Sequence, residues 1–209
     1  MARKPNCPVD ICSHKRSGTH LLAATIWENF ILPDVSVSTT IHRGKKFIIR
    51  DKEWIPGDRV TIPWGGLWRS HNFFQPSNAT HKTLYIVRNP INVLISYWRL
   101  MDPLCRKDPE IYLGEERIAF WVRHATGYTN NCHWIKYEDL VGLKHDQVLE
   151  QIRRWFNLEK RHPEYKRVKY YLGWYPDKTP IQPKAPSSKL RQRLKENIPD
   201  NFLGYNIEE

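Results

Sequence analysis

An apolar run near the start of the chain leads through a polar loop directly into a helical pattern. The run CPVDIC at 7–12 is bounded by a proline and is followed by the loop SHKRSGT at 13–19. Apolar residues then recur at Leu22, Ile26 and Phe30 with the spacing of one helix face. The order strand, loop, helix restricts the chain to folds in which helices pack on a sheet.

The same order recurs further along the chain. KTLYIVRNP holds a β-rich run from Thr83 to Val87 and places Pro90 where a helix begins. CHWIKYEDL predicts a third strand before another helical pattern, and GLWRSHNFF predicts a short strand that ends near His71. Such alternation favours a mainly parallel sheet, so we predict an α/β fold with a doubly wound sheet and flanking helices.

The length of the chain indicates how many domains it forms, and its cysteines indicate the cellular compartment. The 209 residues are typical of one domain, which we assign to 1–209. The four cysteines, Cys7, Cys12, Cys105 and Cys132, include no CxxC pair and no zinc-like spacing. The first residues lack an apolar signal segment, and no uncharged stretch reaches the length of a transmembrane helix. We therefore expect a cytoplasmic protein with no transmembrane segment.

The charge is strongly positive and uneven. The formal net charge is +11, and residues 151–195 hold thirteen Lys and Arg against three Asp and Glu. Such a segment can meet nucleic acid, an acidic polymer or a phosphate-bearing ligand, and it can equally be a set of solvated helix faces. Charge alone does not choose between these interpretations.

The loop at 13–19 has the composition of an anion site. A loop between a strand and a helix lies at the helix N-terminus, where free backbone N–H groups and the helix dipole favour an anion. Gly18 allows close backbone approach, Ser17 and Thr19 offer hydroxyls, and Lys15 and Arg16 supply positive charge. The loop predicts a cradle for phosphate or sulfate, although a basic surface turn capped by Ser17 is the plainer alternative.

The loop does not match the nucleoside triphosphate pattern GxxxxGK[ST]. Ser13 stands where the first glycine is required, and Thr19 stands where the lysine is required. A nucleotide kinase of related fold therefore stays an alternative without a complete triphosphate loop.

Four segments resemble, in order, the motifs of sulfotransferases that use 3′-phosphoadenosine 5′-phosphosulfate. KRSGTHLL is similar to the family's 5′-phosphosulfate loop, and YIVRNPINVLISYW is similar to its 3′-phosphate motif, with Arg88 and Ser96 at the two matching positions. KYEDL resembles the family's Tyr-Glu-Asp segment, and GLWRSHNFF resembles the Lys-Thr-His segment of the catalytic base. The resemblance spans about residues 9 to 140 and implies a divergent, compact, P-loop-like sulfotransferase domain.

The resemblance implies roles for the donor-binding residues. Arg16 would neutralise the bridging oxygen as the phosphate departs, while Ser17, Gly18 and Thr19, beside Lys15, would hold the 5′-phosphate. Further residues would complete the nucleotide site. They are Arg88 and Ser96 for the 3′-phosphate, Tyr137 for the adenine, and His20, which stands where many members have a tryptophan that stacks on the base.

The resemblance also implies an acceptor side and a reaction. His71 would be the general base, and Arg69 stands where the family has a supporting lysine. The reaction would transfer a sulfuryl group to a hydroxyl or an amine, release 3′-phosphoadenosine 5′-phosphate and need no metal. We expect a large or extended hydroxyl-bearing acceptor and no nucleic acid. A non-enzymatic domain that binds polyanions or nucleic acid stays open because of the basic 151–195 segment.

Overall fold

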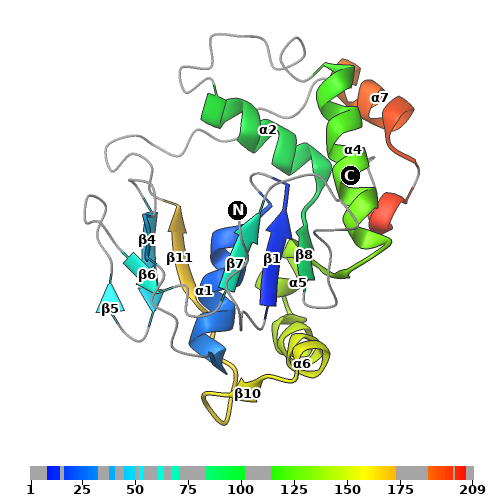
Figure 1. The fold of residues 1–209 in the computed structure, drawn as a ribbon. Helices are drawn as coiled ribbons and strands as arrows, with labels where there is room; N and C mark the ends of the chain where they lie inside the picture. The colour runs from blue at the N-terminus through cyan, green and yellow to red at the C-terminus, as the bar shows by residue number, and fades with distance from the viewer. Residues whose placement is uncertain are drawn as a thin grey trace.

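A four-stranded parallel sheet organises the fold (Figure 1). The computed structural model describes residues 9–14, 17–32, 38–40, 45–49, 52–53, 61–63, 67–70, 83–101, 114–172, 188–199 and 201–205. The sheet has the order β7-β1-β8-β9, formed by Leu67–Ser70, Val9–Ser13, Thr83–Val87 and His133–Lys136. Because each strand is parallel to its neighbours, all four carboxyl ends lie along one edge.

One face of this sheet is covered by α1 (Thr19–Asn29), α5 (Tyr137–Val141) and α6 (His145–Phe156). Ile11 and Leu84 point from the strands into this core, where they meet Leu22 of α1 and Leu149 of α6, and all four are fully buried. Helix α6 presents an apolar stripe to the sheet, whereas nearly all of α1 is buried.

The opposite face is covered by α2 (Pro90–Met101), α4 (Glu115–Thr129) and α7 (Ser188–Asn197). Cys12 and Tyr85, the strand neighbours of Ile11 and Leu84, point into this second core with Trp121 of α4 and Leu194 of α7. Side chains of a strand alternate between its faces, so two buried faces require a nearly continuous apolar run such as TLYIV.

Short antiparallel pairs complete the described structure. They are β2 (Phe30–Ile31) with β10 (Glu159–Lys160), β3 (Ser38–Thr40) with β6 (Thr61–Pro63), and β4 (Lys45–Ile49) between β5 (Lys52–Glu53) and β11 (Lys169–Leu172). A short 3₁₀ turn, η1 (Phe202–Gly204), follows α7.

The expected α/β class, with a parallel sheet and helices on its faces, is confirmed, and so are the strand at 83–87 and the helix that begins at Pro90. The strand predicted in CHWIKYEDL is confirmed as β9, which stops at Lys136, where Tyr137 begins α5. One local expectation was wrong. Phe30 leaves α1 for an extended conformation because it pairs with Lys160 of β10. None of the helices in the described ranges combines the length and the apolar character needed to cross a membrane.

Candidate functional site

The carboxyl edge of the sheet gathers the chain segments that the sequence singled out. β1 ends at Ser13 beside Ile86 of β8, and Val87 at the end of β8 pairs with Lys136 at the end of β9. The helices that follow β1 and β8 leave toward opposite faces of the sheet. Adjacent strands whose connections diverge in this way mark the place where open α/β sheets bind ligands.

The loop after β1 owes its shape to Gly18. This residue precedes α1 with φ of 100° and ψ of 20°, in the left-handed region that favours glycine. Its carbonyl accepts the first helical hydrogen bond, from the Leu22 N–H at 3.0 Å. A Cβ at position 18 would overlap a ring carbon of Tyr137, so both the backbone and the space require glycine.

The hydroxyls of the loop differ in their bonding. Ser13 and Thr19 hydrogen-bond to each other through their side chains. Ser17 is fully buried, and within the described part of the chain its Oγ has no hydrogen-bond partner. Buried hydroxyls nearly always have a partner, and this one lies at the N-terminus of an eleven-residue helix with no acidic residue in its first turn. An oxyanion bound there would supply the partner.

Tyr137 joins the loop to Arg88. Its ring lies against Gly18 on one side, and the Arg88 guanidinium carbon lies 4.5 Å from the ring centroid. Both residues are half-buried and directly follow adjacent strands. A guanidinium stacked on an aromatic ring can still direct its in-plane N–H groups toward an anion. Three residues far apart in sequence thus meet at one point.

The structure describes the remaining predicted site residues to different extents. Ser96 is half-buried nearly two turns into α2, and the backbone of His20 lies in the first turn of α1. The backbone of Arg69 pairs with Ile11, one residue before β7 ends at Ser70. Lys15, Arg16 and His71 lie outside the described residues.

An imidazole and aromatic cluster borders the loop on the side of α2 and α4. His14, buried directly after β1, has its ring centroid 5.7 Å from that of Phe120 and 5.7 Å from that of His124, both on α4. The Tyr85 hydroxyl lies 3.0 Å from Nδ1 of His124. Burial raises the pKa of Tyr85 well above its usual value, so this hydroxyl keeps its proton at neutral pH.

Three further residues meet at this edge without a role predicted from the sequence: Glu138, Asn89 and Tyr205. The Glu138 carboxylate accepts hydrogen bonds from the Asn89 N–H and from the Tyr205 hydroxyl. The sequence held a partial signal for Asn89, since Asn before Pro is typical of a helix N-cap, and its Oδ1 does accept the Ile91 N–H. Tyr205 lies 67 residues from Glu138 and carries no local signal.

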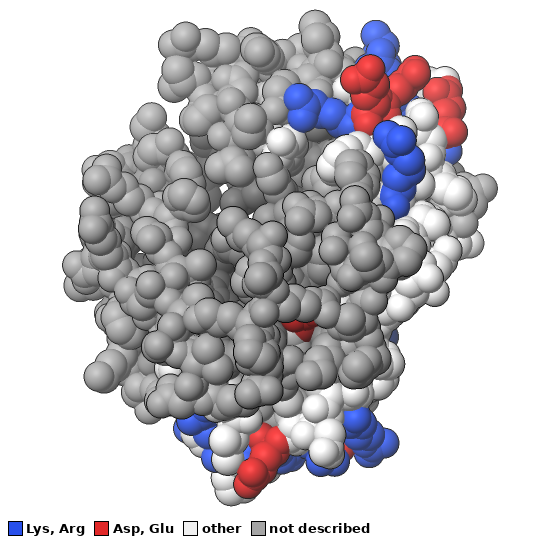
Figure 2. Space-filling view, viewed as in Figure 1, with Lys and Arg blue, Asp and Glu red and all other residues white. Residues whose placement is uncertain are grey.

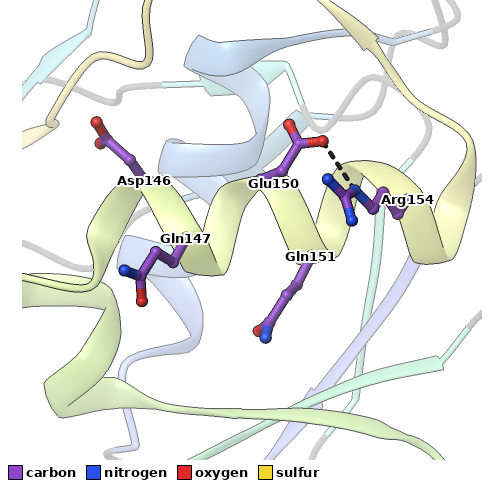
Figure 3. Close-up of a pocket in the computed structure, with 5 residues that line it drawn as sticks. All are labelled: Asp146, Gln147, Glu150, Gln151 and Arg154. Carbon is purple, nitrogen blue, oxygen red and sulfur yellow. Dashed lines mark hydrogen bonds and ion pairs between the residues drawn. The ribbon is translucent and has the colours of Figure 1, made fainter.

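A shallow hollow on α6 lies apart from this edge. Its lining residues all belong to α6, and in Figure 3 Asp146 and Glu150 project from one edge of the helix while Gln147 and Gln151 project from the other. The lining residues are Asp146, Gln147, Glu150, Gln151 and Arg154. One helix surface cannot enclose a ligand, so we do not take the hollow as the candidate site.

The charges on α6 are partly paired. Glu150 accepts hydrogen bonds from Arg153, Arg154 and Tyr165, and the Arg153 contact is the main reason that its pKa lies well below the usual range. In Figure 2, described acidic and basic side chains mix around α6 and β10 and again near α4 and α7. The acidic partners offset part of the basic character of this segment. Within the described ranges, no three His, Cys, Asp or Glu side chains are grouped to hold a metal ion.

The sequence matches no protein-family model and no curated protein. Among solved structures, the chain is similar to the mouse sulfotransferase SULT7A1 complexed with PAP, with 17% sequence identity and a TM-score of 0.46. The match covers 94% of this chain and 64% of that protein. The chain therefore spans slightly less than two thirds of the length of the protein it matches.

Proposed function

We propose that this protein is a sulfotransferase that moves a sulfuryl group from 3′-phosphoadenosine 5′-phosphosulfate to a hydroxyl or amine acceptor. The observation that carries the proposal is the convergence of the Gly18 loop, the buried Ser17 hydroxyl and the Arg88–Tyr137 stack at one sheet edge. An anion cradle and a separate aromatic-stacked cation suit a nucleotide with phosphates on both sides of its ribose.

In this proposal the donor is held from two sides. The N-terminus of α1, with the hydroxyls of Ser17 and Thr19, holds the 5′-phosphate, and Lys15 adds charge. Arg88 and Ser96 hold the 3′-phosphate, because a guanidinium fork suits a phosphate. Tyr137 and His20 contact the adenine base.

The transfer step breaks the bond between sulfur and the bridging phosphate oxygen and forms a bond from sulfur to the acceptor atom. His71, supported by Arg69, takes the acceptor proton, and Arg16 stabilises the charge that develops on the departing phosphate. In this proposal the P-loop-like loop contributes positioning and electrostatic stabilisation rather than a covalent bond to the substrate. In this proposal the acceptor is large or extended.

A ligand panel tests the proposal directly. We expect 3′-phosphoadenosine 5′-phosphate to raise the melting temperature, and ATP with magnesium or single-stranded DNA to raise it much less, because ligands that bind the folded state stabilise it. Selective stabilisation by ATP with magnesium would favour a kinase, and stabilisation by DNA alone would favour a polyanion-binding domain. Transfer from labelled donor to a panel of acceptors would then identify the substrate.

Arg88→Ala is expected to weaken binding of 3′-phosphoadenosine 5′-phosphate at least tenfold, because a charge-assisted hydrogen bond contributes about 1.5 to 3 kcal/mol. Binding of adenosine 5′-phosphate, which lacks the 3′-phosphate, is expected to change little. Calorimetry with both nucleotides measures the two constants. Arg161→Ala is the matched control, because Arg161 also lies over an aromatic ring, that of Trp27. An unchanged preference between the nucleotides in Arg88→Ala would refute the assignment.

Ser17→Ala is expected to leave the free energy of unfolding nearly unchanged or to increase it, because it removes a buried hydroxyl that lacks a partner in the described chain. Nucleotide affinity is expected to fall about tenfold through the loss of one phosphate hydrogen bond. Urea unfolding without ligand and calorimetry with 3′-phosphoadenosine 5′-phosphate give the two numbers. A loss of stability with unchanged affinity would mean that the hydroxyl serves the fold.

A further inference from the structure

The Glu138 carboxylate bridges two chain segments at the carboxyl edge of the sheet. Its Oε1 accepts the backbone N–H of Asn89 at 3.0 Å, and its Oε2 accepts the hydroxyl of Tyr205 at 2.7 Å. Each carboxylate oxygen therefore has one donor, from a different part of the chain. A carboxylate that accepts two such bonds is held in a fixed orientation.

The Tyr205 end of this bridge is itself fixed. Tyr205 is buried, and the ammonium of Lys136 lies 4.7 Å from its ring while donating to the Gly204 carbonyl at 3.0 Å. Burial, and then the hydrogen bond to Glu138, raise the pKa of Tyr205 above its usual value, so its hydroxyl stays a donor at neutral pH. Residues 201–205 are thus attached to the strand that leads into α5.

The Asn89 end of the bridge lies next to the proposed 3′-phosphate site. Asn89 follows Arg88, and Glu138 follows Tyr137, so the bridge joins the two residues next to the stacked pair. Asn89 also caps α2 through the Ile91 N–H, which restrains this turn from its other side. The bond from Glu138 therefore limits how far Arg88 can move relative to the Tyr137 ring.

We propose that Glu138 is a positioning residue for nucleotide recognition, anchored by Tyr205, which holds the Arg88–Tyr137 stack where the guanidinium meets the 3′-phosphate. This inference rests on the proposed function. Arginine side chains have large rotamer freedom, and a binding site loses affinity when its charged group is displaced by even about 0.5 Å. A bridge that fixes the backbone beside both members of the stack reduces that displacement.

Three substitutions test the inference through the ratio of affinities for 3′-phosphoadenosine 5′-phosphate and adenosine 5′-phosphate. Tyr205→Phe removes only the anchoring hydroxyl, and we expect the ratio to fall about threefold to tenfold. Glu138→Ala removes both bonds, and we expect a fall of about tenfold to a hundredfold, as found for residues that orient metal ligands. Glu138→Gln is expected to retain much of the ratio, because its amide oxygen can still accept the Asn89 N–H.

Tyr165→Phe is the matched control. Its hydroxyl donates to the Glu150 carboxylate at 2.8 Å on α6, so the substitution removes the same kind of hydrogen bond away from the sheet edge. We expect Tyr165→Phe to lower the melting temperature about as much as Tyr205→Phe does and to leave the affinity ratio unchanged. If Tyr205 had only a structural role, Tyr205→Phe would also leave the affinity ratio unchanged.

A double-mutant cycle identifies Arg88 as the residue through which Glu138 acts. In the Arg88→Ala background, Glu138→Ala is expected to cause no further fall in the ratio, because residues that act through one contact are not additive. If Glu138→Ala does not fold, Tyr205→Phe, which removes only one hydroxyl, takes its place in the same double-mutant cycle with Arg88→Ala.

The outcomes separate this inference from the proposed function. A wild-type protein that prefers 3′-phosphoadenosine 5′-phosphate, with Tyr205→Phe and Glu138→Ala keeping that preference, would overturn the inference and leave the proposed function standing. Additive falls of the ratio in the double variant would also overturn it. A wild-type protein that binds both nucleotides equally, or neither, would overturn both proposals together.

Discussion

Gly18→Ala is expected to lower the free energy of unfolding by about 3 kcal/mol and to abolish most nucleotide binding. Two costs add. An alanine at φ of 100° is strained, and its Cβ would overlap the Tyr137 ring, which the Arg88 guanidinium covers on one side. Relief of the overlap requires the ring to move, and that movement would separate the stacked pair that we propose as the 3′-phosphate site.

Urea unfolding and nucleotide calorimetry measure the two effects of Gly18→Ala. Gly127→Ala is the control, because Gly127 lies inside α4, where alanine stabilises a helix by about 0.5 to 1 kcal/mol. Adding Tyr137→Leu to Gly18→Ala is expected to recover the part of the loss due to overlap and to leave the backbone strain. A Gly18→Ala protein as stable as the wild type would contradict the loop geometry.

His71→Ala is expected to reduce turnover by about a hundredfold to ten-thousandfold, the usual effect of removing a positioned general base. Nucleotide binding is expected to survive, because His71 would face the acceptor. Single-turnover rates with labelled donor, together with the nucleotide dissociation constant, give both quantities. Near-normal turnover would remove the base assignment and direct attention to His14, the buried histidine that directly follows β1.

Arg16→Ala provides the contrast on the donor side. Arg16 would contact the departing phosphate, so its loss is expected to weaken binding and turnover together. The split between the two variants therefore distinguishes a residue that acts on the acceptor from one that acts on the donor. Equal effects of both substitutions on nucleotide affinity would argue against the proposed placement of His71.

The local pattern of the sequence was sufficient for the central sheet. The run TLYIV, buried on both faces, and Pro90 after it predict a strand and a helix start that the structure confirms. Phe30 was assigned to the helix because its apolar character continues the helical spacing. Its pairing with Lys160 of β10 decided its extended conformation instead, and periodicity cannot register such a pairing.

For the candidate site, the sequence by itself determined which residue types follow each strand: a glycine loop after β1, Arg88 after β8 and Tyr137 after β9. Their contact was decided only by the tertiary structure, because it depends on the parallel order β1-β8-β9 that aligns the three strand ends. The bridge from Asn89 through Glu138 to Tyr205 depends on the return of residues 201–205 to the end of β9. Hydrogen bonds between segments so distant in sequence leave no periodic trace, since each donor and acceptor is common in every protein.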